Sequence, residues 1–90
     1  MPYIKKDARL EIDPMRNPDH YRMPENAGEL NYLLTEIVLS YLNNRPGHHP
    51  ARYQDYNDVL GVLTAMQHEI YRRLIAPYED EKIKENGDVY

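Results

Sequence analysis

The strongest structural signal in the chain lies in residues 55–76, which read DYNDVLGVLTAMQHEIYRRLIA. Apolar side chains recur there at steps of three and four residues, the spacing that gives a helix one apolar face. Asp55 is the expected N-cap, because its carboxylate can accept a hydrogen bond from the first turn. Pro77 is expected to end the helix, since proline lacks the N–H that an interior turn needs. The face itself comprises Tyr56, Val59, Leu60, Leu63, Met66, Gln67, Ile70 and Leu74.

A second helix is expected over residues 28–43. Asn26 can cap its start, with Glu29 three residues further on as in a capping box. Segment 45–52 holds two prolines and a glycine and is therefore a loop. Two helices joined by so short a loop should form an antiparallel hairpin. The apolar residues of this helix are Leu30, Leu33, Leu34, Ile37, Val38, Tyr41 and Leu42.

The helix over 28–43 carries apolar side chains on two sides. At about 100° per residue, Leu34 and Ile37 share one face, whereas Tyr32 and Leu39 lie nearly opposite. A helix that is apolar on two sides usually has protein on both. We therefore expect an all-α fold, in which an antiparallel helical hairpin assembles as a homo-oligomeric bundle, most simply a dimer. The alternative is a monomer in which the N-terminal residues cover the second apolar side of this helix.

The remaining residues read as irregular or charged. Residues 1–27 contain four prolines, so we expect an irregular arm in which only Lys5–Ile12 could form a short helix. The hairpin would occupy residues 28–77. Residues 78–90 would be a charged C-terminal tail with a turn at Asn86-Gly87.

Composition limits the class of protein. The chain has 90 residues, a net charge of −4, no cysteine and nine aromatic residues, all of them tyrosine. This is typical of one small soluble domain, and without cysteine neither a disulfide nor a thiolate metal site can form. The acidic balance argues against bulk binding to nucleic acid. A cytoplasmic protein without a membrane span is expected, because the opening MPYIKK is not leader-like and no apolar run approaches about 18 residues.

No catalytic or metal-binding motif is evident. His48 and His49 are adjacent on the loop, and His68 lacks a second histidine at the spacing of a zinc-binding helix. Ser40 is the only serine and has no nucleophile-elbow context. The acidic run 79–81 lies in a charged segment, where solvation is its ordinary role. We therefore predict that the protein is not an enzyme, holds no metal and uses no cofactor.

A polar stripe on the helix over 55–76 is the candidate binding site. Its members recur at steps of three and four residues and span about 80° of the helix surface. Their amide, hydroxyl and guanidinium groups suit a phosphate-bearing ligand, and a tyrosine ring suits base stacking. The alternative is an ordinary solvent-facing stripe, which any amphipathic helix has. The stripe comprises Asn57, Gly61, Thr64, His68 and Tyr71 with Arg72 at its edge, and a neighbouring chain could add Arg45, Arg52 and Tyr53.

Much of the chain resembles a family of small uncharacterised proteins of bacteria and their phages. The resemblance lies in the opening MPYIK, GELNY at 28–32, YNDVLGVL at 56–63, YRR at 71–73, APYED at 76–80 and the ending NGDVY. Residues 13–26 depart from the family pattern. The resemblance implies a phage or prophage accessory protein, a setting in which small helical oligomers include viral sponges that sequester cyclic nucleotide signals of bacterial immunity.

Two functions of different classes follow from these observations. The first is a non-catalytic oligomer that sequesters an anionic, cyclic nucleotide at a subunit interface in a phage anti-defence role. The second is a small helical interaction module that docks on a host or phage protein. The expected partners are therefore a second copy of the chain, together with either a cyclic nucleotide or such a protein.

Overall fold

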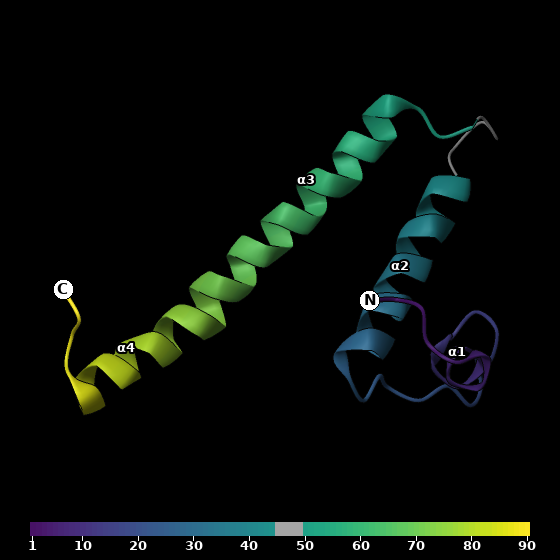
Figure 1. The fold of residues 1–90 in the computed structure, drawn as a ribbon. Helices are drawn as coiled ribbons and strands as arrows, with labels where there is room; N and C mark the ends of the chain where they lie inside the picture. The colour runs from purple at the N-terminus through teal and green to yellow at the C-terminus, as the bar shows by residue number, and fades with distance from the viewer. Residues whose placement is uncertain (45–49) are drawn as a thin grey trace. The chain divides into compact units, whose positions relative to one another are not determined.

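The computed structural model describes residues 1–44 and 50–90, and these residues contain helices and no strand. This confirms the all-α class. The helices are α1 (Lys6–Ile12), α2 (Ala27–Asn43), α3 (Tyr53–Ile70) and α4 (Ala76–Asn86), with a π-helical turn, η2 (Tyr71–Ile75), between the last two (Figure 1). The chain divides into two units, Met1–Ala51 and Arg52–Tyr90. The hairpin and the homo-oligomer remain predictions.

The first unit is built around α1 and α2, which pack against each other. Its core is small: Ile12 is completely buried, and Tyr32 is 6% exposed. The guanidinium of Arg9 lies 5.6 Å from the centre of the Tyr32 ring, a cation–π distance. The N-terminal residues thus cover the Tyr32 side of α2, as the monomer alternative predicted for that side, while Leu39 stays 46% exposed.

The start of α2 is fixed by local hydrogen bonds. The Asn26 side chain accepts a hydrogen bond of 2.9 Å from the backbone N–H of Glu29, which confirms Asn26 as the N-cap. Only half of the expected capping box forms, because the Glu29 carboxylate accepts from the N–H of Glu25 and not from that of Asn26. Gly28 allows the N-terminus to approach: a Cβ there would lie 3.3 Å from the carbonyl oxygen of Met1.

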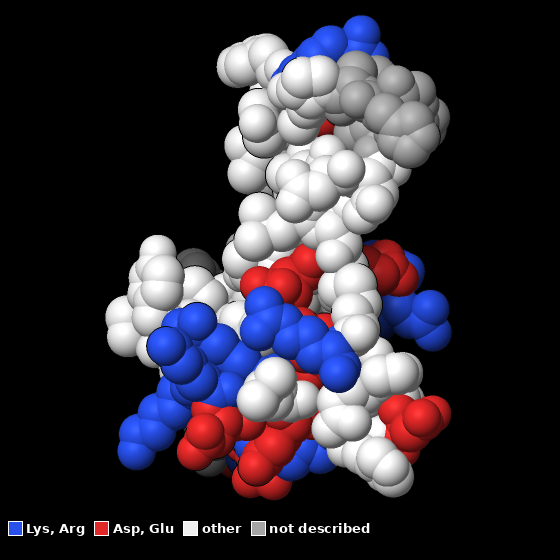
Figure 2. All heavy atoms as spheres, turned by 90° about the vertical axis from the view of Figure 1, so that its right-hand side faces the viewer, with Lys and Arg blue, Asp and Glu red and all other residues white. Residues whose placement is uncertain are grey.

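The other face of α2 has little cover within its unit. Leu30, Leu34, Ile37 and Tyr41 are between 36% and 50% exposed. Figure 2 shows that the acidic and basic side chains of this unit gather around α1 and the residues that follow it, whereas α2 above them carries few charges. On the face drawn in Figure 2, most charged side chains therefore lie apart from α2.

The second unit is one continuous helical run, and the predicted end at Pro77 is wrong. Pro77 lies in the first turn of α4, and the helix runs on to Asn86. The π-turn explains how: the N–H of Ala76 bonds to the carbonyl of Tyr71, five residues back. This wider turn gives the proline ring room that a regular α-turn lacks. Most of the segment expected as a charged tail is thus helical.

Two further details of the second unit differ from expectation. The N-cap of α3 is Arg52, and Asp55 is its third residue, where a carboxylate oxygen accepts a 2.9 Å hydrogen bond from the Arg52 N–H. Asp55 therefore still stabilises the start of the helix, from within its first turn. At the far end Gly87, with φ of +89°, ends α4, a backbone conformation that glycine adopts without strain. None of the described helices is both long and apolar enough to cross a bilayer.

Candidate functional site

The polar stripe predicted from the sequence lies on one continuous helix. Asn57, Gly61, Thr64 and His68 come from α3, whereas Tyr71 and Arg72 open the π-turn. All six residues are exposed, and a Cβ at Gly61 would meet no atom within 4 Å. The stripe is thus an open surface on this helix, not a cavity.

Acidic neighbours engage two of the residues that were expected to contact a nucleotide, Tyr71 and Arg72. Arg72 donates a 2.7 Å hydrogen bond to the carboxylate of Glu69, and Arg73 lies 3.8 Å from the same oxygen. The pKa of the Tyr71 hydroxyl is raised, first because it hydrogen bonds to Glu79. An incoming phosphate would therefore meet carboxylates beside its expected partners, and like charges repel.

Arg52 and Tyr53, two of the three residues predicted to join from the loop, lie at the other end of this helix. Arg52 caps α3, and Tyr53 is its first residue with 79% of its surface exposed. At 1.5 Å per residue, Tyr53 and Arg72 are about 28 Å apart along the axis, so they cannot line one small site within a single chain. Arg45 lies outside the described residues, as do His48 and His49.

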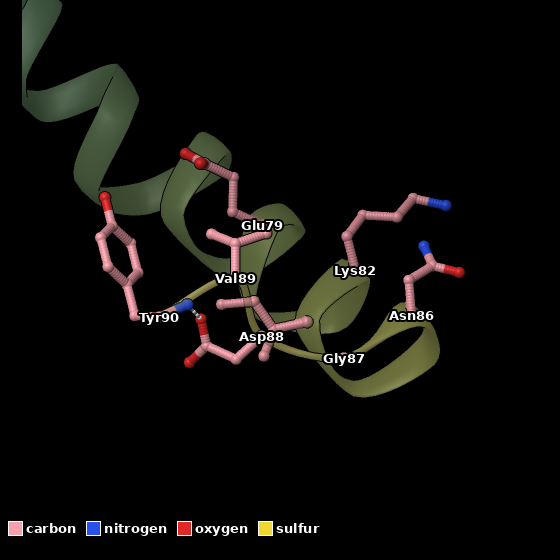
Figure 3. Close-up of a pocket in the computed structure, with 8 residues that line it drawn as sticks. Glu79, Lys82, Asn86, Gly87, Asp88, Val89 and Tyr90 are labelled. Atoms are coloured by element: carbon pink, nitrogen blue, oxygen red, sulfur yellow. Dashed lines mark hydrogen bonds between the residues drawn. The ribbon is translucent and has the colours of Figure 1, made fainter.

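A shallow depression lies at the C-terminal end of α4, between Lys82 and Val89 (Figure 3). Its shape comes from the turn at Gly87 and from a 3.0 Å hydrogen bond between the Tyr90 N–H and the Asp88 carboxylate. Val89 is 92% exposed, and Tyr90 is fully exposed. The two side chains are open to solvent, so this depression lacks the enclosing walls of a typical ligand site.

The best-organised polar cluster is one that sequence reasoning missed. Arg22 holds Glu29 with two hydrogen bonds of 2.6 and 3.1 Å and also donates to Glu11 at 2.8 Å. This fork lowers the pKa of Glu29 to about 2, and the hydrogen bond from the Glu25 N–H adds to the effect. The same carboxylates raise the pKa of Arg22. The cluster ties the segment after α1 to the start of α2, which is a structural task.

Two further polar groups are buried in the same unit. Asp13 is 1% exposed, and its carboxylate accepts from the Met15 N–H at 2.9 Å and lies 3.5 Å from the Arg16 guanidinium. The Tyr32 hydroxyl is buried and has no hydrogen-bond partner among the described residues. Burial raises the pKa of Tyr32.

Across residues 1–44 and 50–90, no three histidine or acidic side chains are grouped closely enough to hold a metal ion. The polar stripe thus forms an extended, exposed face of the second unit, and the cluster of Arg22, Glu11 and Glu29, here called the Arg22 clasp, holds the first unit together.

Comparison with known proteins places the chain in a family without assigning it a function. No curated protein and no solved structure matches it significantly. The family that matches is described as a domain of unknown function (DUF6899), and the match covers residues 1–89. The chain therefore belongs to the DUF6899 family.

Proposed function

We propose that the protein is a non-catalytic interaction module that works by binding another protein chain through the apolar face of α3. The observation that carries this proposal is the exposure of that face. Leu63, Met66 and Ile70 are 37–44% exposed, and Tyr56, Leu60 and Leu74 are 50–67% exposed. These six side chains follow one another along the continuous helical run of α3 and η2. They therefore form one apolar stripe.

Leaving such a stripe exposed to water forgoes the free energy that its burial would contribute. Burying a leucine or isoleucine side chain stabilises a protein by about 1.5–3 kcal/mol, and contiguous apolar patches on a free surface typically mark interaction sites. The recurrence at three- and four-residue steps is the pattern by which an amphipathic helix docks into a groove or against another helix. The apolar face of α2 is a second surface of the same kind.

Co-purification tests the proposal. The full chain, carrying a C-terminal affinity tag, is expressed in its native cell, and native mass spectrometry measures which chains co-purify and in what ratio. We expect a stoichiometric partner, either a second copy or a different protein. Leu63→Glu should release a partner that covers the centre of the stripe, because a charge would be buried there.

The matched control is Val62→Glu, which makes the same change at a neighbouring exposed residue outside the stripe. Circular dichroism of both variants checks that the helix survives. A wild-type chain that never carries a stoichiometric partner would refute the proposal. So would a partner that both Leu63→Glu and Val62→Glu release.

Sequestration of a cyclic nucleotide in a phage anti-defence role is the second candidate. The exposed side chains of the polar stripe support it, Arg72 among them with 70% of its side chain accessible. The Glu69 and Glu79 carboxylates weigh against it. Calorimetry with cyclic and linear nucleotides tests it: Arg72→Ala should weaken binding about 10- to 150-fold. No heat of binding from the wild type would refute this candidate and leave the first one intact.

A further inference from the structure

The apolar stripe continues past the π-turn. Ile70, Leu74 and Tyr78 follow one another at four-residue steps and are 44%, 67% and 63% exposed. In a regular α-helix each such step advances about 40° around the axis, so the stripe would drift off its face. The π-turn takes an additional residue to complete its circle, and this keeps the three side chains closer to one line.

The length of the helical run shows that α2 can cover only part of it. From Tyr53 to Asn86 the run is about 50 Å long, whereas α2, with 17 residues, is about 25 Å long. Even a hairpin that placed all of α2 along α3 would leave the second half, with Leu74 and Tyr78, without a long helix of the same chain beside it. The apolar side chains of that half of the helical run can therefore be covered by a helix of another chain.

The charges beside this half are arranged so that a second copy fits in one direction. Arg73 follows Ile70 by three residues and Glu81 follows Tyr78 by three, so both flank the stripe on the same side. Their present partners bind weakly: Arg73 is 3.8 Å from Glu69, and Glu81 is 3.6 Å from Lys84, all on exposed side chains. Exposed pairs of this kind contribute little and are free to exchange.

We propose that a second copy of this chain packs antiparallel on residues 70–84, with its twofold axis near Pro77. This assigns the partner of the C-terminal end of the apolar stripe, past Leu63, and rests on the proposal that the stripe binds protein. In this arrangement Arg73 of each copy lies level with Glu81 of the other, and Leu74 lies near Tyr78 of the other. A parallel pair would instead separate Arg73 of each copy from Glu81 of the other by about 12 Å along the axis. Such a twofold interface is closed and uses one patch twice.

A charge exchange tests the pairing. Light scattering and sedimentation measure the dimer affinity of the wild type, Arg73→Glu and Glu81→Lys at micromolar concentration. Each single variant should bind itself on the order of 10-fold more weakly, because two attractive contacts become repulsive. An equimolar mixture of the two variants should regain wild-type affinity, since in the mixed dimer every contact is again between opposite charges. Asp80→Lys is the control, because residue 80 lies opposite the stripe and should keep wild-type affinity.

Cross-linking tests the direction, since the natural chain has no cysteine. Two Tyr78→Cys copies would lie about 3 Å apart along the axis and should form a disulfide readily. Two Leu63→Cys copies would lie about 42 Å apart and should not. A parallel dimer would cross-link at both positions and would overturn the inference, as would a mixture of charge variants that fails to regain affinity.

The two proposals fail in different ways. A monomeric wild type overturns the self-pairing, and if a different protein co-purifies through Leu63, the interaction-module proposal still stands. If neither a second copy nor another protein binds, both are refuted.

Discussion

Truncation of Ile12 to alanine should unfold the N-terminal unit. Ile12 is the one apolar side chain of that unit that is completely buried, and it ends α1 where α1 packs on α2. Removing a buried isoleucine to alanine costs about 2–5 kcal/mol. A unit of this size has a total stability of only about 2–7 kcal/mol at typical values per residue, so the loss is comparable with the whole.

Hydrogen exchange followed by mass spectrometry measures this loss locally. Amides of α2 around Tyr32 should lose most of their protection in Ile12→Ala, whereas amides of α3 should keep theirs. Ile12→Val removes a single methylene and should cost about 0.5–1.5 kcal/mol, which gives an intermediate loss of protection.

Leu10→Ala is the matched control for this prediction. Leu10 lies on the same short helix and is 53% exposed, so its truncation should change protection by no more than about 0.5 kcal/mol. If the α2 amides lost the same protection from hydrogen exchange in Ile12→Ala and in Leu10→Ala, the assignment of Ile12 as the core of this unit would be refuted.

Three further outcomes are expected. Asn26→Ala should destabilise the N-terminal unit by about 1 kcal/mol through loss of its cap, read as a lower midpoint in urea, and an unchanged midpoint would contradict the capping role. Pro77→Ala should raise the melting temperature of the second unit, because alanine restores a backbone donor, and a lower temperature would show that the π-turn is required. Glu29 has its pKa lowered from 4.5 to about 2, so its contribution to stability is full above about pH 4.5 and is lost as the pH falls toward 2. Arg22→Lys, which lacks the two-pronged guanidinium, should flatten that acid dependence in thermal melts, and an identical pH profile would argue against the clasp.

Helix α2 shows how much of the fold could be predicted from the sequence. Its bounds and its Asn26 cap follow from spacing and from side-chain chemistry that acts within four residues. The helix across Pro77 could not be predicted in the same way, because a wider turn removes the clash that makes proline a helix breaker. The Arg22 clasp also escaped prediction, since its partners are 7 and 11 residues away and no periodicity encodes such a pairing.

The candidate site shows the same limit at the level of chemistry. Spacing predicted which residues share the polar face, but the chemical character of that face depends on its neighbours. Glu69, three residues before Arg72, could have been recognised as a partner from its spacing. Glu79, eight residues after Tyr71, reaches the Tyr71 hydroxyl across the π-turn, and a regular helix would not have suggested that contact.

The burial of a single tyrosine supplies the chain with an internal optical reporter. With neither tryptophan nor phenylalanine in the sequence, its near-ultraviolet signal comes from tyrosine alone, and Tyr32 is the one tyrosine that is buried. In an alkaline titration followed by absorbance, the ionisation of Tyr32 should lag behind that of the exposed phenols other than Tyr71, because burial raises the pKa of Tyr32, whereas Glu79 raises that of Tyr71. The size of that lag measures whether the N-terminal residues are seated on α2, without any label, in every variant described above.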